Sequence, residues 1–294
     1  MKNSFRPDLS IIIPAYNEAE AIPTILNKLC SEEALKEAEI IVVDDGSTDH
    51  TNEQVKLFPK VRLVRHPVNR GYGAAISTGI KISKGRFVVW FDGDGQHRVE
   101  DLIRVAQKLL QQDLDFCIGV RDHNSYQDTT RKFGKFFLRQ AVRLVARKSL
   151  KDFNSGLRGF KKDVIKRYLH LFPRRFGAST LTSLLMIERG YIGEEIPITV
   201  CKRIGKSSVK QVSDGFGTLM LLLRFFLLFR PIHFFGGIGT ALILFGGIYG
   251  LFKAYLIHKG FPVFGALLII LGIQSLFFGL ICDQISSLRQ ERLD

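Results

Sequence analysis

Two carboxylates and an amide follow a short apolar stretch in the first half of the chain. Residues 87–91 read Phe-Val-Val-Trp-Phe, and Asp92, Asp94 and Gln96 then occupy alternate positions. Carboxylate and amide oxygens are the ligands that a hard divalent cation takes, and one or two carboxylates leave room for phosphate oxygens on the same ion. The pattern therefore indicates a site for a hard divalent cation. The alternative is a solvated turn, because Asp-Gly pairs are common in turns.

The elements that must position these residues alternate between strand and helix patterns. Short runs rich in β-branched residues predict strands over 10–14, 39–45, 61–64, 87–91 and 116–119, with helices between them. This alternation predicts an α/β fold with a mostly parallel sheet covered on both faces. Ligands bind at the carboxyl ends of the strands in such sheets. The residues predicted at those ends are Pro14, Tyr16, Glu18, Asp44, Asp45, Asp92, Asp94 and Gln96.

A glycine-rich stretch, Asn-Arg-Gly-Tyr-Gly-Ala-Ala at 69–75, opens a helix predicted to end near residue 83. It resembles the start of a dinucleotide-binding loop, but the third glycine of that motif is missing and the acidic residue comes before the loop instead of after it. We therefore interpret Gly71 and Gly73 as turn and close-packing glycines. Contact with a phosphate is the alternative.

Positive charge is concentrated in one part of the chain. The net charge is +14, and residues 121–175 hold sixteen Lys or Arg against four Asp. Such a surface favours a phosphate-bearing partner: nucleic acid, an anionic membrane or a phosphorylated substrate. Within it, residues 129–150 predict one basic amphipathic helix that lies on a membrane surface. The alternative is a helix packed on the domain with a solvated basic face.

The C-terminal quarter has the composition of a membrane segment. Residues 232–257 and 263–282 are each long and apolar enough to cross a bilayer, whereas 214–230 is shorter and predicts an interfacial helix. The predicted organisation is a cytoplasmic domain over 1–213, the interfacial helix, a two-helix hairpin within 231–283 and a tail over 284–294. Because the flanking domain is basic, the positive-inside rule places that domain and both termini in the cytoplasm, at a bacterial-type inner membrane.

Two details of the same region bear on compartment and assembly. Gly246 and Gly250 form a Gly-x-x-x-Gly pair, which predicts a helix contact either within the hairpin or between subunits of a homo-oligomer. The four cysteines are scattered singly, without the spacing of a metal or disulfide site, which favours a reducing compartment. The apolar segments argue against nucleic acid as a partner of this chain.

Four motifs, taken in order, resemble family 2 glycosyltransferases. They are Ile-Ile-Pro-Ala-Tyr-Asn-Glu, Val-Val-Asp-Asp-Gly-Ser-Thr-Asp, the glycine stretch and Asp-Gly-Asp-Gly-Gln. The resemblance spans about residues 8–210 and is narrower to the branch that acts on polyprenyl phosphates. It implies a GT-A fold and an inverting transfer of one sugar from a UDP- or GDP-linked donor, with Mg²⁺ or Mn²⁺ as cofactor.

The resemblance also assigns residues. It implies that the nucleotide is held by Pro14, Tyr16, Glu18, Val43 and Asp45, that Asp92 contacts ribose or sugar, and that Asp94 and Gln96 ligate the metal. Residues 152–158 are similar to the family's Asp-x-x-Ser-Gly-Phe-Arg motif, and 203–208 to its Arg-x-x-Gly-x-Ser-Lys motif, with Ser208 replacing the final Lys. The residues expected to contact the acceptor phosphate are Arg121, Arg131, Ser155, Arg158 and Lys206. Catalytic roles are expected for Asp94, Asp152, Arg131 and Arg203.

The acceptor decides how much acid–base chemistry is required. A hydroxyl acceptor needs a general base, whereas a phosphate monoester is largely ionised at neutral pH and needs only positioning and charge compensation. The arginine-rich sequence agrees with the second case. Asp152 is predicted to orient the acceptor site, with an ion pair to a neighbouring basic residue as the alternative. Competing hypotheses are a transferase acting on another lipid, such as diacylglycerol, and a non-catalytic membrane subunit that retains the fold.

Overall fold

The structure is a computed structural model that describes residues 8–122, 125, 152, 155–175, 177–204, 220–221, 223–258 and 260–291. The chain divides into two compact units, Met1–Leu221 and Leu222–Asp294. Each unit is described by itself below. The predicted helix over 129–150, together with Arg131 and Lys206, lies outside the described residues, as does most of the predicted interfacial segment.

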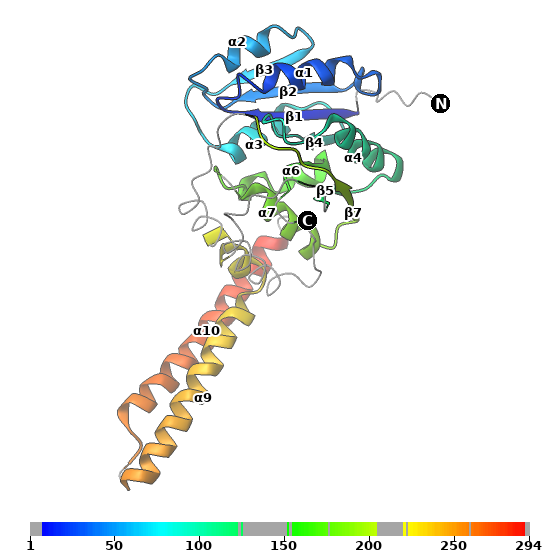
Figure 1. The fold of residues 1–294 in the computed structure, drawn as a ribbon. Helices are drawn as coiled ribbons and strands as arrows, with labels where there is room; N and C mark the ends of the chain where they lie inside the picture. The colour runs from blue at the N-terminus through cyan, green and yellow to red at the C-terminus, as the bar shows by residue number, and fades with distance from the viewer. Residues whose placement is uncertain are drawn as a thin grey trace. The chain divides into compact units, whose positions relative to one another are not determined.

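The N-terminal unit is built on one seven-stranded sheet in the order β3-β2-β1-β4-β6-β5-β7 (Figure 1). Strands β1 to β4 pair in parallel, as do β5 and β7, while β6 runs antiparallel to both of its neighbours. The α/β fold with a mostly parallel sheet is therefore confirmed. The strands are β1 Leu9–Ala15, β2 Glu39–Asp44, β3 Val61–Arg65, β4 Phe87–Trp90, β5 Phe116–Arg121, β6 Arg158–Lys161 and β7 Gly193–Ile198.

The helices of this unit cover both faces of the sheet. Helices α1, α2 and α4 pack on one face, and α3 and α6 on the other (Figure 1). Helix α4 lies between the last two predicted strands, where a helix is expected, and α3 begins at Tyr72, inside the glycine stretch. The helices are α1 Ile22–Ser31, α2 Thr51–Lys56, α3 Tyr72–Ile82, α4 Val99–Gln112, α6 Lys162–Arg167 and α7 Ala178–Glu188, with short 3-10 turns η1 Glu33–Leu35 and η3 Leu169–Leu171.

The alternation of side chains along β1 explains how the layers are held together. Every residue of β1 is buried, which is typical of a strand covered on both faces. Ile11 and Ile13 join the large core beneath α1 and α4, whereas Ile12 points toward α3. A Cβ added to Gly79 of α3 would lie 3.3 Å from the Ile12 Cβ, so this glycine allows α3 to approach the sheet closely.

The C-terminal unit contains two long apolar helices, α9 Pro231–Ile257 and α10 Val263–Glu291. By length and composition, both could cross a membrane. They pack against each other through glycines: a Cβ on Gly239 would lie 2.7 Å from the Gly272 carbonyl oxygen, and one on Gly246 would lie 2.8 Å from that of Gly265. Of the two locations predicted for the Gly246 contact, the structure shows the one within the hairpin.

Candidate active site

Two loops at the carboxyl ends of β1 and β2 are joined by hydrogen bonds. Asn17 adopts the left-handed conformation, with φ 55°, and its Oδ1 accepts from the Thr48 N–H at 2.8 Å. The Asn17 N–H donates to Ser47 Oγ at 3.0 Å, and the Glu18 N–H donates to Thr51 Oγ1 at 2.9 Å. Asn is among the few residues that adopt this conformation readily. These bonds fix the backbone on which Glu18 points into the site.

The two aspartates at the end of β2 are held inside the protein. Asp44 is fully buried and accepts from the Ser47 N–H at 2.8 Å. Asp45 accepts from the N–H groups of Arg70 at 3.0 Å and Gly71 at 2.7 Å, and lies 2.6 Å from His66 Nδ1. Asp45 thus anchors the start of the glycine stretch. Its predicted contact with the nucleotide stays a prediction, and any such contact would share an oxygen that already has a partner.

The N-terminus of α3 is occupied by protein carbonyl groups. The Gly73 N–H donates to the Arg175 carbonyl oxygen at 3.1 Å, and the Ala74 N–H donates to that of Arg174 at 3.0 Å. Gly71 has φ 99°, and a Cβ there would lie 2.5 Å from the Arg174 carbonyl oxygen. In this structure, the free N–H groups of the first helical turn therefore cap a neighbouring segment. This agrees with the interpretation of both glycines as turn and close-packing residues.

The turn after β4 meets a loop that follows β7. The Cys201 N–H donates to the Gln96 carbonyl oxygen at 2.8 Å, and the Ile204 N–H donates to that of Asp94 at 3.1 Å. Between these bonds, Arg203 extends into the site, where Nη1 donates to Asp94 Oδ2 at 3.2 Å and Nη2 donates to Glu18 Oε1. Residues from three separated parts of the chain therefore meet at one guanidinium group.

The carboxylates of this site are crowded in a region poor in solvent. Burial raises the pKa of Glu18 to about 8, against the lowering effect of Arg203. Burial and the Asp94 carboxylate raise the pKa of Asp92 to about 7, and burial also raises the pKa of Asp94. A raised carboxylate pKa means that the negative form is destabilised, here mainly because burial removes it from water. Such a cluster favours the arrival of a cation.

The donor set at this turn fits a divalent cation that is shared with a substrate. Among the described residues, no group of three His, Cys, Asp or Glu side chains could hold a metal by itself. Asp94 and Gln96 instead supply one carboxylate and one amide. Mg²⁺ is usually bound in this way, through one or two carboxylates together with substrate phosphates. The metal-ligand roles of Asp94 and Gln96 thus remain compatible with the geometry.

Asp92 is clamped between three groups. The Tyr72 hydroxyl donates to Oδ1 at 2.7 Å, and His97 Nε2 lies 3.8 Å from Oδ2. On a third side, a Cβ added to Gly156 would lie 2.8 Å from Asp92 Cγ. Neither Tyr72 nor His97 is among the residues that the sequence predicts for the site. The signal for His97 was its place directly after the Asp-Gly-Asp-Gly-Gln turn.

The residues predicted to face the acceptor phosphate have different surroundings. Arg121 and Asp152 form a two-bonded ion pair, with Nε to Oδ2 at 2.6 Å and Nη2 to Oδ1 at 2.8 Å. The ion pair proposed as the alternative role of Asp152 is therefore present. Ser155 is buried, and its carbonyl oxygen accepts from Arg158 Nε at 2.7 Å. The acceptor contacts of Arg121 and Ser155 stay predictions.

Arg158 is fully buried in the interior of the unit. Its Nη1 donates to the Ser179 carbonyl oxygen at 2.6 Å and to Ser183 Oγ at 2.7 Å, which ties β6 to the start of α7. Burial lowers the pKa of Arg158 to about 10. These contacts give Arg158 a structural role, while its predicted contact with a phosphate is not tested by them.

Three further residues predicted to hold the nucleotide lie around the same sheet edge. Pro14 is buried in β1, Tyr16 is half-buried in the loop that follows, and the Val43 side chain packs against Ala75 of α3 in the core. A contact between Val43 and a ligand would have to use its backbone. Asp94, Gln96, Glu18 and Arg203 are the predicted residues that the structure brings together most directly.

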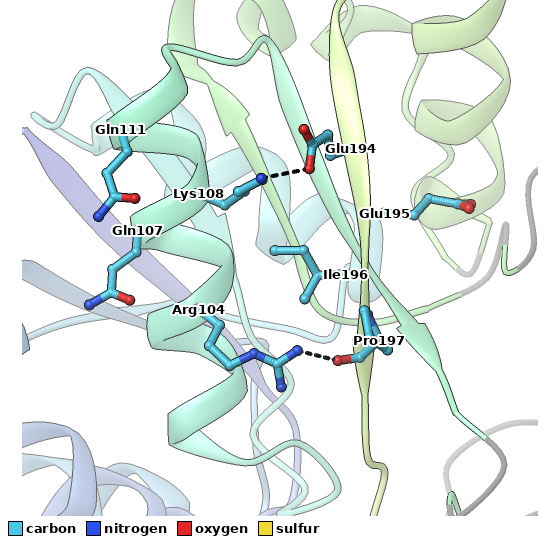
Figure 2. A pocket seen from close by; sticks show the side chains of 8 residues that line it. All are labelled: Arg104, Gln107, Lys108, Gln111, Glu194, Glu195, Ile196 and Pro197. Carbon is cyan, nitrogen blue, oxygen red and sulfur yellow. Dashed lines mark hydrogen bonds and ion pairs between the residues drawn. The ribbon is translucent and has the colours of Figure 1, made fainter.

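A hollow of about 390 Å³ lies between α4 and β7 (Figure 2). Two contacts are made by its lining residues: Lys108 Nζ lies 3.0 Å from Glu194 Oε2, and Arg104 Nη2 donates to the Pro197 carbonyl oxygen at 2.6 Å. None of the residues predicted for the active site lines this hollow. We therefore assign no function to it.

Comparisons with known proteins agree on the kind of domain. Residues 10–169, more than half of the chain, match the glycosyl transferase family 2 model, and 230–288 match the model for the GtrB C-terminal hairpin. An uncharacterised protein of Methanocaldococcus jannaschii is 33% identical over 227 residues, which cover 74% of this chain and 92% of that protein. Dodecaprenyl-phosphate galacturonate synthase of Rhizobium johnstonii is 25% identical over 309 residues, covering 95% and 88%.

A solved structure shares the fold of the N-terminal unit. Glucosyl-3-phosphoglycerate synthase of Mycobacterium tuberculosis, crystallised with Mn²⁺, UDP and its product, superposes with a TM-score of 0.58 at 17% identity. The match covers 74% of this chain and 79% of that one. At this identity the similarity extends to the GT-A-like fold alone.

Proposed function

The chain belongs to glycosyl transferase family 2, and on that premise we propose that it transfers one sugar from a nucleoside-diphosphate sugar to the phosphate of a polyprenyl lipid. The observation that carries the proposal is the convergence of Asp94 and Gln96, which follow β4, with Glu18 and Arg203 at one edge of the sheet. Family membership makes the chain a glycosyltransferase. The donor and the lipid acceptor are what we add.

The donor side of the site handles negative charge. Asp94 and Gln96 would hold a divalent cation, which offsets the charge that develops on the leaving diphosphate. Arg203 is the cationic side chain that already reaches this position, and its planar group suits two phosphate oxygens. Tyr16 and Glu18, in the loop after β1, would border the nucleotide. Which nucleotide and which sugar are bound depends on the shape of the donor pocket.

The acceptor side needs no strong base. The second ionisation of a phosphate monoester has a pKa of about 6, so most of the acceptor is already a dianion at neutral pH. Arg121, held by Asp152, would orient that phosphate in line with the anomeric carbon. Asp92, held by the Tyr72 hydroxyl, would then position the sugar, and attack from the opposite face inverts the anomeric centre.

Membrane association follows from the second unit. Both long helices are apolar enough to span a bilayer, and relatives that match almost the whole chain carry names of polyprenyl-phosphate enzymes. We infer that the hairpin crosses the membrane twice. By the positive-inside rule, the basic residues of the N-terminal unit support a cytoplasmic location for that unit and for both termini.

A transfer assay tests the proposal. The purified chain in detergent is given undecaprenyl phosphate, Mg²⁺ or Mn²⁺, and a panel of labelled UDP- and GDP-sugars. Label in the lipid that depends on metal, and that is lost in Asp94→Asn, is the expected result. If no donor gives labelled lipid although the protein binds nucleotide, the polyprenyl-phosphate acceptor is wrong, and diacylglycerol becomes the next acceptor to test.

A further inference from the structure

The Arg203 guanidinium donates a hydrogen bond to an Asp94 oxygen that a metal at the proposed site would use. Asp94 Oδ1 accepts from the Gln96 N–H at 3.0 Å, which closes the turn, and Oδ2 accepts from Arg203 Nη1 at 3.2 Å. Both oxygens of the predicted metal ligand are therefore engaged by the protein itself. A cation that binds through Oδ2 has to displace the guanidinium group or share the oxygen with it.

The position of Arg203 is set by the backbone. Its loop is bonded to the turn that follows β4. The Cys201 N–H donates to the Gln96 carbonyl oxygen at 2.8 Å, and the Ile204 N–H donates to that of Asp94 at 3.1 Å. On the far side, Glu18 Oε1 accepts a hydrogen bond from Arg203 Nη2, and the Glu18 N–H donates to Thr51 Oγ1. The guanidinium therefore bridges two carboxylates from two different loops.

The guanidinium nevertheless has a donor without a partner. Arg203 Nε is buried, and in the described part of the structure it makes no hydrogen bond. A buried unpaired N–H of a charged group is costly. A diphosphate offers several anionic oxygens to a planar group of this kind. A ligand of that chemistry could satisfy Nε, and it would compete with Asp94 for the same side chain.

We propose that, in the nucleotide-free protein, the Arg203 guanidinium occupies the place beside Asp94 where the metal ion would bind. When a nucleoside diphosphate binds, the guanidinium moves to its phosphates. The metal and the nucleotide then bind together, because the nucleotide both removes the competing cation and adds ligands for the metal. This inference rests on the proposed function, since it assumes a nucleoside-diphosphate donor. It makes Arg203 a residue that determines the order of binding, in addition to its contact with the donor.

The decisive measurement is Mn²⁺ binding to the full chain in detergent without nucleotide. Binding is monitored as the loss of the electron paramagnetic resonance signal of free Mn²⁺. Arg203→Gln should bind Mn²⁺ about tenfold more tightly than the natural chain, within the range usual for coupled sites. Lys202→Gln, which removes the same charge from an exposed neighbour, should leave the affinity unchanged. Asp94→Asn in the Arg203→Gln background should abolish the gain, which shows that the ion is at this site.

Adding UDP or GDP completes the test. The natural chain should gain Mn²⁺ affinity strongly with nucleotide, and Mn²⁺ should raise nucleotide affinity by the same factor, because coupling between two ligands is reciprocal. In Arg203→Gln this coupling should shrink to the part that comes from the metal bridging the phosphates. Melting curves show whether each variant is folded. If Arg203→Gln is not, Arg203→Lys replaces it, since one ammonium group cannot bridge Glu18 and Asp94, and an intermediate affinity is expected.

Two other outcomes separate the failures. Unchanged or weaker Mn²⁺ binding in folded Arg203→Gln, with nucleotide binding intact, overturns the inference and leaves the proposed function standing. Absence of Mn²⁺, UDP and GDP binding in both the natural chain and the variant overturns the proposed function together with the inference.

Discussion

The substitution Gly156→Ala tests whether the position of Asp92 matters for transfer. The added Cβ would lie 2.8 Å from Asp92 Cγ and 3.0 Å from His97 Nε2, and closer still to Asp92 Oδ2. Carbon atoms in contact are separated by about 3.5–4.0 Å, so Asp92 has to retreat by roughly 0.7 Å or more. That movement also strains the 2.7 Å hydrogen bond from Tyr72.

The size of the expected effect follows from this displacement. A misplacement of about 1 Å at a reacting centre can lower the rate about 100-fold, while overpacking costs about 1–3 kcal/mol of stability. Gly156 is not among the glycines with positive φ, so alanine strains the packing and not the backbone. We therefore expect a folded protein with kcat/KM reduced about 100-fold.

The assay is the transfer of labelled sugar to undecaprenyl phosphate, with circular dichroism and a melting curve to show that the variant is folded. Gly247→Ala is the matched control, because a Cβ at Gly247 meets no atom within 4 Å. Transfer by folded Gly156→Ala within about threefold of the natural chain would refute the reasoning that Asp92 must be held in this place.

Three further changes test other parts of the account. Tyr72→Phe removes the donor to Asp92 and should lower kcat about 10- to 100-fold, as expected for loss of a hydrogen bond to a charged group; an unchanged kcat would contradict this. Burial and Arg121 lower the pKa of His97 to about 4, so below pH 6.5 the unfolded chain takes up this proton first. As the pH is lowered from 6.5 to 4, the free energy of unfolding of the natural chain should therefore fall by up to about 3 kcal/mol more than that of His97→Gln. Denaturant curves that give the same loss for both chains would contradict this. Gly246→Leu, which meets the facing helix, should lower the melting temperature of the chain in detergent, whereas Gly247→Leu should not; equal effects would mean that the glycine contacts do not hold the hairpin.

Much of the fold follows from local patterns. The buried runs that form β1, β2 and β4 have the composition of strands covered on both faces, and the helices predicted between the strands are present. Because parallel strands end at one edge of the sheet, sequence order also predicts that the turn with Asp94 and Gln96 lies beside the loop after β1.

The antiparallel strand β6 could not be identified in the same way. It has only four residues and begins with Arg158. This residue belongs to the stretch that resembles a phosphate-binding motif, and its charge interrupts the apolar run from which a buried strand is predicted. Burial of this arginine is possible because Ser179 and Ser183 of α7 receive its donors. That compensation depends on a helix about twenty residues away and is not visible locally.

Partner choice within the site is the other feature that local patterns miss. Asp45, which is predicted to bind nucleotide, also accepts hydrogen bonds from two backbone N–H groups and lies against His66, all more than 20 residues away. Glu18 and Arg203 are 185 residues apart and meet only once the sheet has formed. A carboxylate in a motif can bind a ligand or another part of the chain, and only the folded arrangement shows which partners are in reach.

The identity of both products tests the central claim most directly. The reaction mixture is analysed by mass spectrometry for the lipid and for the released nucleotide. Transfer of a sugar to a lipid phosphate predicts a lipid with a single phosphate between sugar and polyprenol, together with one equivalent of nucleoside diphosphate. A lipid diphosphate with release of nucleoside monophosphate, or a sugar attached to a lipid that carries no phosphate, would contradict the account.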